Sequence, residues 1–224
     1  MEPFGQTLLF TGIIPALILL FIGLKGYEGF YREKTIFITF ILGVVLGGIA
    51  VVVRIIVNPP LFLIIYLILF AVFEQLFKTM FLNIKRFQKK KETTIYGLSL
   101  GLGFGSSFTP FLLIVGSKIS DDPFFLSLLA FGSMGFIFFH AATSAYIGYG
   151  IYQEKLAKHL VYAILFQIPF NIFTDVARYT INPYLIYAQV IIVVYGLILF
   201  IYVIKRIIPK ILRQDIKRRR GKKT

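Results

Sequence analysis

The sequence contains no cysteine, and this absence excludes disulfide bonds, thiolate nucleophiles and cysteine-ligated metals. It also contains no Rossmann fingerprint, no P-loop and no His-Glu-x-x-His metalloprotease motif. The glycine-rich run at 101–105 lies within an apolar segment, where a nucleotide-binding loop is not expected. The usual signatures of nucleotide-dependent enzymes and of zincin proteases are therefore missing.

Acidic residues are scarce, with 10 Asp and Glu against 24 Lys and Arg, for a formal net charge of +14. The basic residues are not interleaved with aromatic residues in a nucleic-acid-binding fold, so no nucleic-acid partner is expected. The basic residues gather instead in short segments between apolar runs and in residues 209–224. We therefore predict that residues 209–224 form a basic cytoplasmic tail that attracts anionic lipid headgroups.

Apolar residues dominate the rest of the chain. The sequence is 58% hydrophobic with a mean hydropathy of +0.83, whereas soluble domains are about 45–50% apolar. Apolar runs of about 20 residues recur, and each is long enough to cross the hydrocarbon of a bilayer as a helix. The first run is interpreted as a retained span, because no basic region precedes it and Lys25 rather than a cleavage site follows it. We predict an all-α, multi-pass protein of the cell membrane, a seven-transmembrane helix bundle within residues 1–208, with spans near 4–24, 35–57, 61–84, 94–116, 124–151, 157–177 and 183–204.

The basic residues also predict the orientation of the bundle. They concentrate in the loops after the first, third and fifth spans and in the tail, whereas the other side of the membrane carries only Arg54, Lys118 and Arg178. By the positive-inside rule, the amino terminus lies outside and the carboxyl terminus lies in the cytoplasm.

Polar and charged side chains inside the predicted spans are the candidate functional residues, because such groups are costly in a bilayer. A Glu, a His and an amide near the middle of three spans suit a metal or acid–base site, and equally a hydrogen-bonded cluster that holds helices together. Glu74 and Lys78 could also form an internal ion pair. Both interpretations stay open at this point. The predicted buried polar cluster comprises Glu74, Gln75, Lys78, His140, Ser144, Gln167, Asn171 and Asp175.

Gly97, Gly101 and Gly105 recur at four-residue spacing in the fourth span and therefore lie on one face of a helix. Such a stripe lets a neighbouring backbone approach closely, because no side chain intervenes. The stripe is a predicted helix-packing or partner interface, and its spacing does not decide whether the neighbour belongs to this chain.

These residues resemble the anterior-pharynx-defective (Aph) family, the seven-span scaffold subunit of gamma-secretase. The glycine stripe and its intervening residues match the fourth span of that family, and His140 matches an assembly histidine of the fifth. A second family histidine, in span six, is missing, and the nearest residue is Gln167. Abundant Ile and Lys without cysteine favour a prokaryotic or archaeal homologue. The other matching segments are Glu74-Gln75-Leu76-Phe77-Lys78, Asp121-Asp122-Pro123-Phe124-Phe125 and Asn182-Pro183-Tyr184.

The resemblance implies a non-catalytic scaffold that needs no cofactor or metal and binds a presenilin-like aspartyl protease. The family is distantly similar to PrsW-type and CAAX-type intramembrane metalloproteases, whose Glu-Glu-x-x-Lys motif reads Glu74-Gln75-x-x-Lys78 here. One carboxylate of that motif is lost, and the fourth span carries none. A divergent metalloprotease using Glu74 and His140 is the first alternative. A small transporter or lipid-binding protein is the second.

Overall fold

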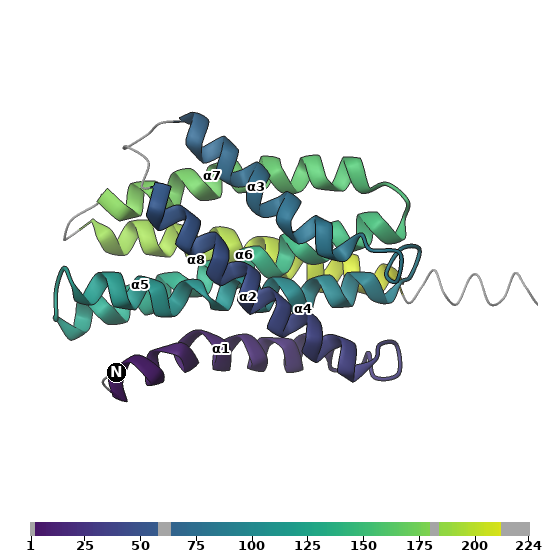
Figure 1. The fold of residues 1–224 in the computed structure, drawn as a ribbon, viewed down its shortest axis with the longest axis horizontal. Coiled ribbons are helices and arrows are strands. Elements are labelled where there is room, and N and C mark those ends of the chain that lie inside the picture. The colour runs from purple at the N-terminus through teal and green to yellow at the C-terminus, as the bar shows by residue number, and fades with distance from the viewer. Residues whose placement is uncertain (1–2, 58–63, 180–183, 212–224) are drawn as a thin grey trace, which may run out of the picture.

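A computed structural model describes residues 3–57, 64–179 and 184–211, which form a bundle of helices (Figure 1). No strand occurs within these ranges. The helices are α1 (Pro3–Leu24), α2 (Glu33–Val57), α3 (Ile64–Leu82), α4 (Glu92–Ser106), α5 (Phe108–Ser117), α6 (Pro123–Tyr152), α7 (Leu156–Tyr179) and α8 (Leu185–Tyr202), followed by a π-helical turn, Val203–Ile207.

Six helical segments of the described chain are long and apolar enough to cross a membrane, which confirms an all-helical fold consistent with a multi-pass membrane protein. Helix α1 coincides with the first predicted span, and its described apolar part, Phe10–Leu24, is shorter than the other six. A seventh crossing and the direction of the termini stay predictions. Asn182 and Pro183, and residues 212–224 of the predicted tail, lie outside the described residues. The six segments are Glu33–Val57, Ile64–Leu82, Glu92–Ser117, Pro123–Tyr152, Leu156–Arg178 and Leu185–Ile211.

Two of the predicted spans differ from the observed helices, one in where it ends and one because it is divided. The last helix continues past residue 204 through the π-helical turn to residue 211, because Ile207, Ile208 and Ile211 remain buried. The predicted span 94–116 is divided at Ser107 into α4 and α5. Pro110 explains the division, since its nitrogen carries no hydrogen to donate to the Ser106 carbonyl one turn earlier. Gly12 of α1 lies against that carbonyl, so close that an added Cβ would stand 2.1 Å from the oxygen.

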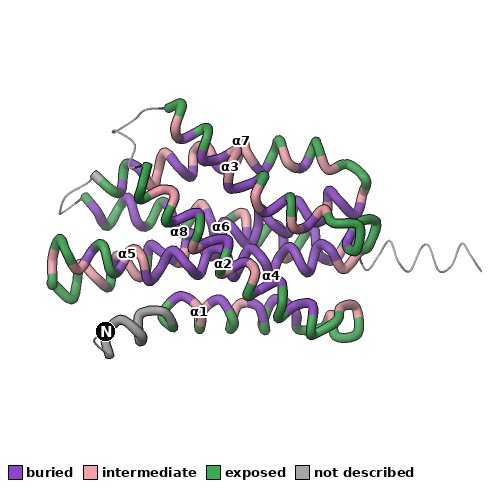
Figure 2. Tube along the Cα trace, in the orientation of Figure 1, coloured by how far each residue is buried: buried purple, intermediate pink, exposed green. Residues whose placement is uncertain are grey.

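Helix α4 lies inside the bundle, and every residue from Thr93 to Ser106 is buried (Figure 2). Its glycine stripe faces α6. A Cβ added at Gly97, Gly101 or Gly105 would lie between 2.2 and 2.6 Å from a backbone atom of that helix. Gly103, on the other side of α4, lies equally close to the backbone of α2 at Phe40. The stripe therefore packs within the chain and brings three helices together at backbone contact.

Helix α6 begins at the Asp-Pro-Phe-Phe segment noted in the sequence. The Asp122 carboxylate accepts hydrogen bonds from the backbone nitrogens of Phe124 and Phe125, at 3.2 and 3.3 Å. Pro123 occupies the first helical position, where no backbone donor is needed. This cap determines where α6 starts and therefore how far along the helix His140 lies.

We expect Gly101→Leu to destabilise the protein by at least about 3 kcal/mol, because its Cβ would lie 2.2 Å from the His140 carbonyl oxygen and overpacking a dense core is costly. Gly48→Leu on α2 is the matched control, since nothing lies within 4 Å of a Cβ added there. The thermal midpoints of both variants in detergent measure the difference. Equal loss for the two variants would show that close α4–α6 packing does not support the fold.

Candidate functional site

A fully buried polar cluster lies where α3, α6 and α7 meet. Glu74, Gln75 and Lys78 come from α3, His140 from α6 and Gln167 from α7, and none is more than 1% exposed. The sequence placed Glu74, His140 and Gln167 near the middle of three different spans, and the structure brings them together.

Two glutamines link α3 to α7 by a directed chain of hydrogen bonds. The Gln75 side-chain nitrogen donates to the Gln167 carbonyl oxygen, and the Gln167 nitrogen donates to Oε2 of Glu74. Each amide supplies one donor to this chain, which a carboxylate at either position could not do. The chain therefore depends on an amide at position 75 and on another at position 167.

Lys78 joins the cluster to α6. Its Nζ lies 3.2 Å from Nδ1 of His140 and donates to the Thr143 hydroxyl at 3.1 Å. The ammonium also lies 5.1 Å from the centre of the Phe104 ring, a cation–π distance. Within the described residues, Lys78 makes no direct ion pair with Glu74, so these groups do not form the pair that their i, i+4 spacing allows.

His140 lies between the two charges instead. Its Nε2 is 3.8 Å from Oε2 of Glu74, while its Nδ1 faces Lys78. With Lys78 as donor to Nδ1, the ring proton is assigned to Nε2, on the side of Glu74. The imidazole thus lies between the buried lysine and the buried glutamate, and these two groups of opposite charge type share one cluster.

Aromatic rings enclose His140. Phe108 stacks on the imidazole at 5.2 Å between centres, and Phe104 lies at 4.6 Å. Phe139 and Phe170 present ring edges from α6 and α7. Such an apolar surround strengthens the electrostatic interactions inside the cluster, because the local dielectric constant is low.

The remaining predicted polar residues lie around this cluster. Asn171 donates to the Leu67 carbonyl oxygen at 2.9 Å and accepts from the Arg54 guanidinium at 2.9 Å. Ser144 is buried next to α4, and its hydroxyl has no hydrogen-bond partner among the described residues. Asp175 lies one turn beyond Asn171 and is 8% exposed. Arg54 was assigned only to the side of the membrane opposite the basic loops, and no sequence signal connected it to Asn171.

Several buried polar atoms of the cluster lack a hydrogen-bond partner within the described chain. They include Oε1 of Glu74, Oε1 of Gln75 and Nε2 of His140. Glu74 and His140 are the residues of the cluster able to bind a metal ion strongly. No group of three or more His, Cys, Asp or Glu side chains that could hold a metal ion gathers anywhere in the described residues.

No protein family, curated protein or solved structure with which the chain was compared matches it.

We expect Lys78→Met to cost about 3–5 kcal/mol of stability, because it leaves the buried Glu74 carboxylate without a balancing charge. Adding Glu74→Gln should recover most of this loss, since both charges are then absent and a glutamine still accepts from Gln167. Thermal midpoints of the wild type, both single variants and the double variant form a double-mutant cycle. Additive losses would show that the two charges do not depend on each other.

Proposed function

We propose that the protein is a non-catalytic membrane scaffold that binds and stabilises a presenilin-like intramembrane aspartyl protease. The observation that carries this proposal is the hydrogen-bonding role of Gln75. It replaces the second glutamate of the related metalloprotease motif, and its amide donates to Gln167. Because a carboxylate could not make that bond, residue 75 suits helix assembly better than metal binding.

The packing of α4 supports the same proposal. Helix α4 contacts the backbone of α6 through Gly101 and the backbone of α2 through Gly103, and this arrangement suits a rigid frame for a partner. By the Aph resemblance, the carboxyl-terminal segment of the partner would enter the bundle. The unpartnered oxygens of Glu74 and Gln75 are acceptors that such a segment would satisfy. In this proposal α1 is a seventh crossing, the amino terminus lies outside and the basic end faces the cytoplasm.

A divergent metalloprotease is the second candidate, and one observation favours it. Glu74 and His140 approach to 3.8 Å, and each has an unpartnered atom, of which Nε2 of His140 would have to lose its proton to bind a metal. Glu74 would then serve as a ligand or as the general base of a metal-activated water. This candidate requires a bound metal and cleavage that depends on Glu74.

Co-expression with a presenilin-like protein from the same genome tests the scaffold directly. We expect the two proteins to co-purify in mild detergent and to crosslink in membranes, because the scaffold buries part of its partner in the bundle. A polytopic membrane protein of unrelated fold, tagged in the same way, is the control. Recovery no greater than that of the control, together with absent crosslinks, would refute the proposal.

The charge-balanced double variant Glu74→Gln/Lys78→Met separates the two candidates. A scaffold should keep its partner, because the link from Gln167 to position 74 persists, whereas a metalloprotease should lose both its metal and its activity. Metal analysis, cleavage assays and co-purification are measured on the same preparations after the elution profile shows a folded protein. Stoichiometric metal and cleavage in the wild type alone would establish the enzyme instead.

A further inference from the structure

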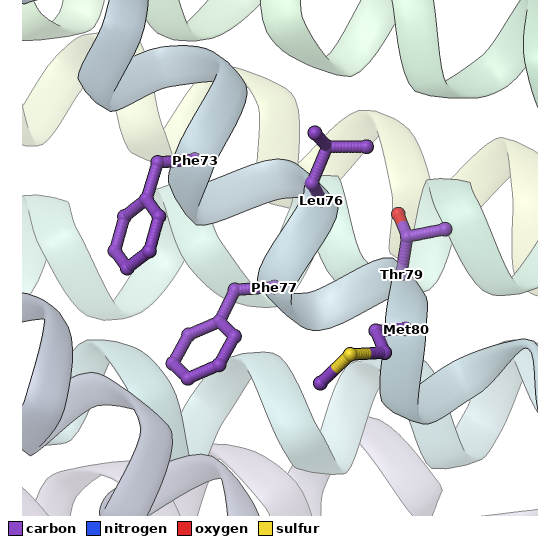
Figure 3. A pocket seen from close by; sticks show the side chains of 5 residues that line it. All are labelled: Phe73, Leu76, Phe77, Thr79 and Met80. Atoms are coloured by element: carbon purple, nitrogen blue, oxygen red, sulfur yellow. The ribbon is translucent and has the colours of Figure 1, made fainter.

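The outer side of α3 carries an open pocket away from the polar cluster. Phe73, Leu76, Phe77, Thr79 and Met80 line this α3 groove, and Figure 3 shows the rings of Phe73 and Phe77 next to each other along the helix. Leu76 and Met80 are 47% and 58% exposed. The Thr79 hydroxyl donates to the Gln75 carbonyl at 2.7 Å, so the groove wall is chemically apolar.

Basic residues lie where the groove ends. Lys85 and Arg86 follow α3 directly and are exposed. An ion pair between Lys89 and Glu154, at 3.4 Å, holds this loop next to the loop between α6 and α7. That second loop adds the exposed Lys155 to the same end of the bundle. An apolar surface thus leads into a positively charged one.

We propose that the α3 groove binds an acyl chain of an anionic phospholipid whose phosphate lies against Lys85 and Arg86. The groove extends over seven helical steps, or about 10 Å, against about 15 Å for the hydrocarbon of one leaflet. A chain lying in it therefore brings its headgroup to the basic loop. Lys and Arg next to the bilayer surface attract anionic lipid.

The side chains of the groove favour a lipid over a transmembrane helix as the occupant. Helix–helix contacts in membranes use small residues, and Thr79 is the one small residue among the five that line this surface. The Phe73 and Phe77 rings stack at 5.3 Å and form a smooth aromatic wall. Met80 is flexible and fits irregular apolar partners. These features suit a thin, mobile acyl chain.

Fluorescence quenching tests this proposal, because the sequence contains no tryptophan. Met80→Trp places a single reporter in the groove, and Ile191→Trp places one on the exposed side of α8, away from Lys205 and Arg206, as a control. The purified full-length variants are reconstituted in vesicles of phosphatidylcholine and phosphatidylglycerol in equal amounts, with one lipid brominated at a time. We expect the groove reporter to prefer phosphatidylglycerol by about fivefold or more over the control position.

Lys85→Gln/Arg86→Gln in the Met80→Trp background should reduce this preference to that of the control. The same preference at both reporters, or no effect of the loop substitutions, would overturn the proposal. Protection of the groove reporter from both lipids would also overturn it and would point to a protein covering the groove. No presenilin-like protein is present, so the result is independent of the scaffold function.

Discussion

A single methyl group on Gly101 would stand 2.2 Å from the carbonyl oxygen of His140, and the rest of the structure depends on the helix approach that this distance reflects. With no side chain between them, the backbones of α4 and α6 determine each other's position. The carbonyl belongs to the residue whose imidazole lies at the centre of the polar cluster. Packing between glycine and backbone therefore positions the imidazole, which itself contacts Phe104 of α4.

The polar cluster in turn links α3, α6 and α7 inside the bundle. His140 lies between Lys78 and Glu74, in contact with the lysine at Nδ1 and 3.8 Å from the carboxylate at Nε2. The amides of Gln75 and Gln167 link the Glu74 carboxylate to α7. These hydrogen bonds fix the positions of α3, α6 and α7 relative to each other along their axes. In the proposed scaffold, this rigidity would serve to bind a partner. The unpartnered oxygens of the cluster are the places where a partner's donors would complete it.

Patterns within one helix were predictable from the sequence, and so was one meeting of residues from different helices, but the other contacts between helices were not. The four-residue spacing of Gln167 and Asn171 determines their common face, and mid-span depth suggested that Glu74 and His140 could meet. The approach of Arg54 to Asn171 depends on how α2 crosses α7, which apolar length and loop charge do not encode. The i, i+4 spacing of Glu74 and Lys78 allowed a direct pair, but tertiary packing turns the lysine toward α6 instead.

The central claim is that Glu74 and His140, from different helices, meet inside the bundle. Solid-state NMR on lipid-embedded protein measures it through the dipolar coupling between histidine ring nitrogens and glutamate carboxylate carbons. The chain has two histidines, so a His159→Gln variant assigns the His140 signal. A strong coupling that disappears in the Glu74→Gln/Lys78→Met variant is the predicted result, given the 3.8 Å separation of Nε2 and Oε2. A His140 signal without coupling to any glutamate would contradict the account.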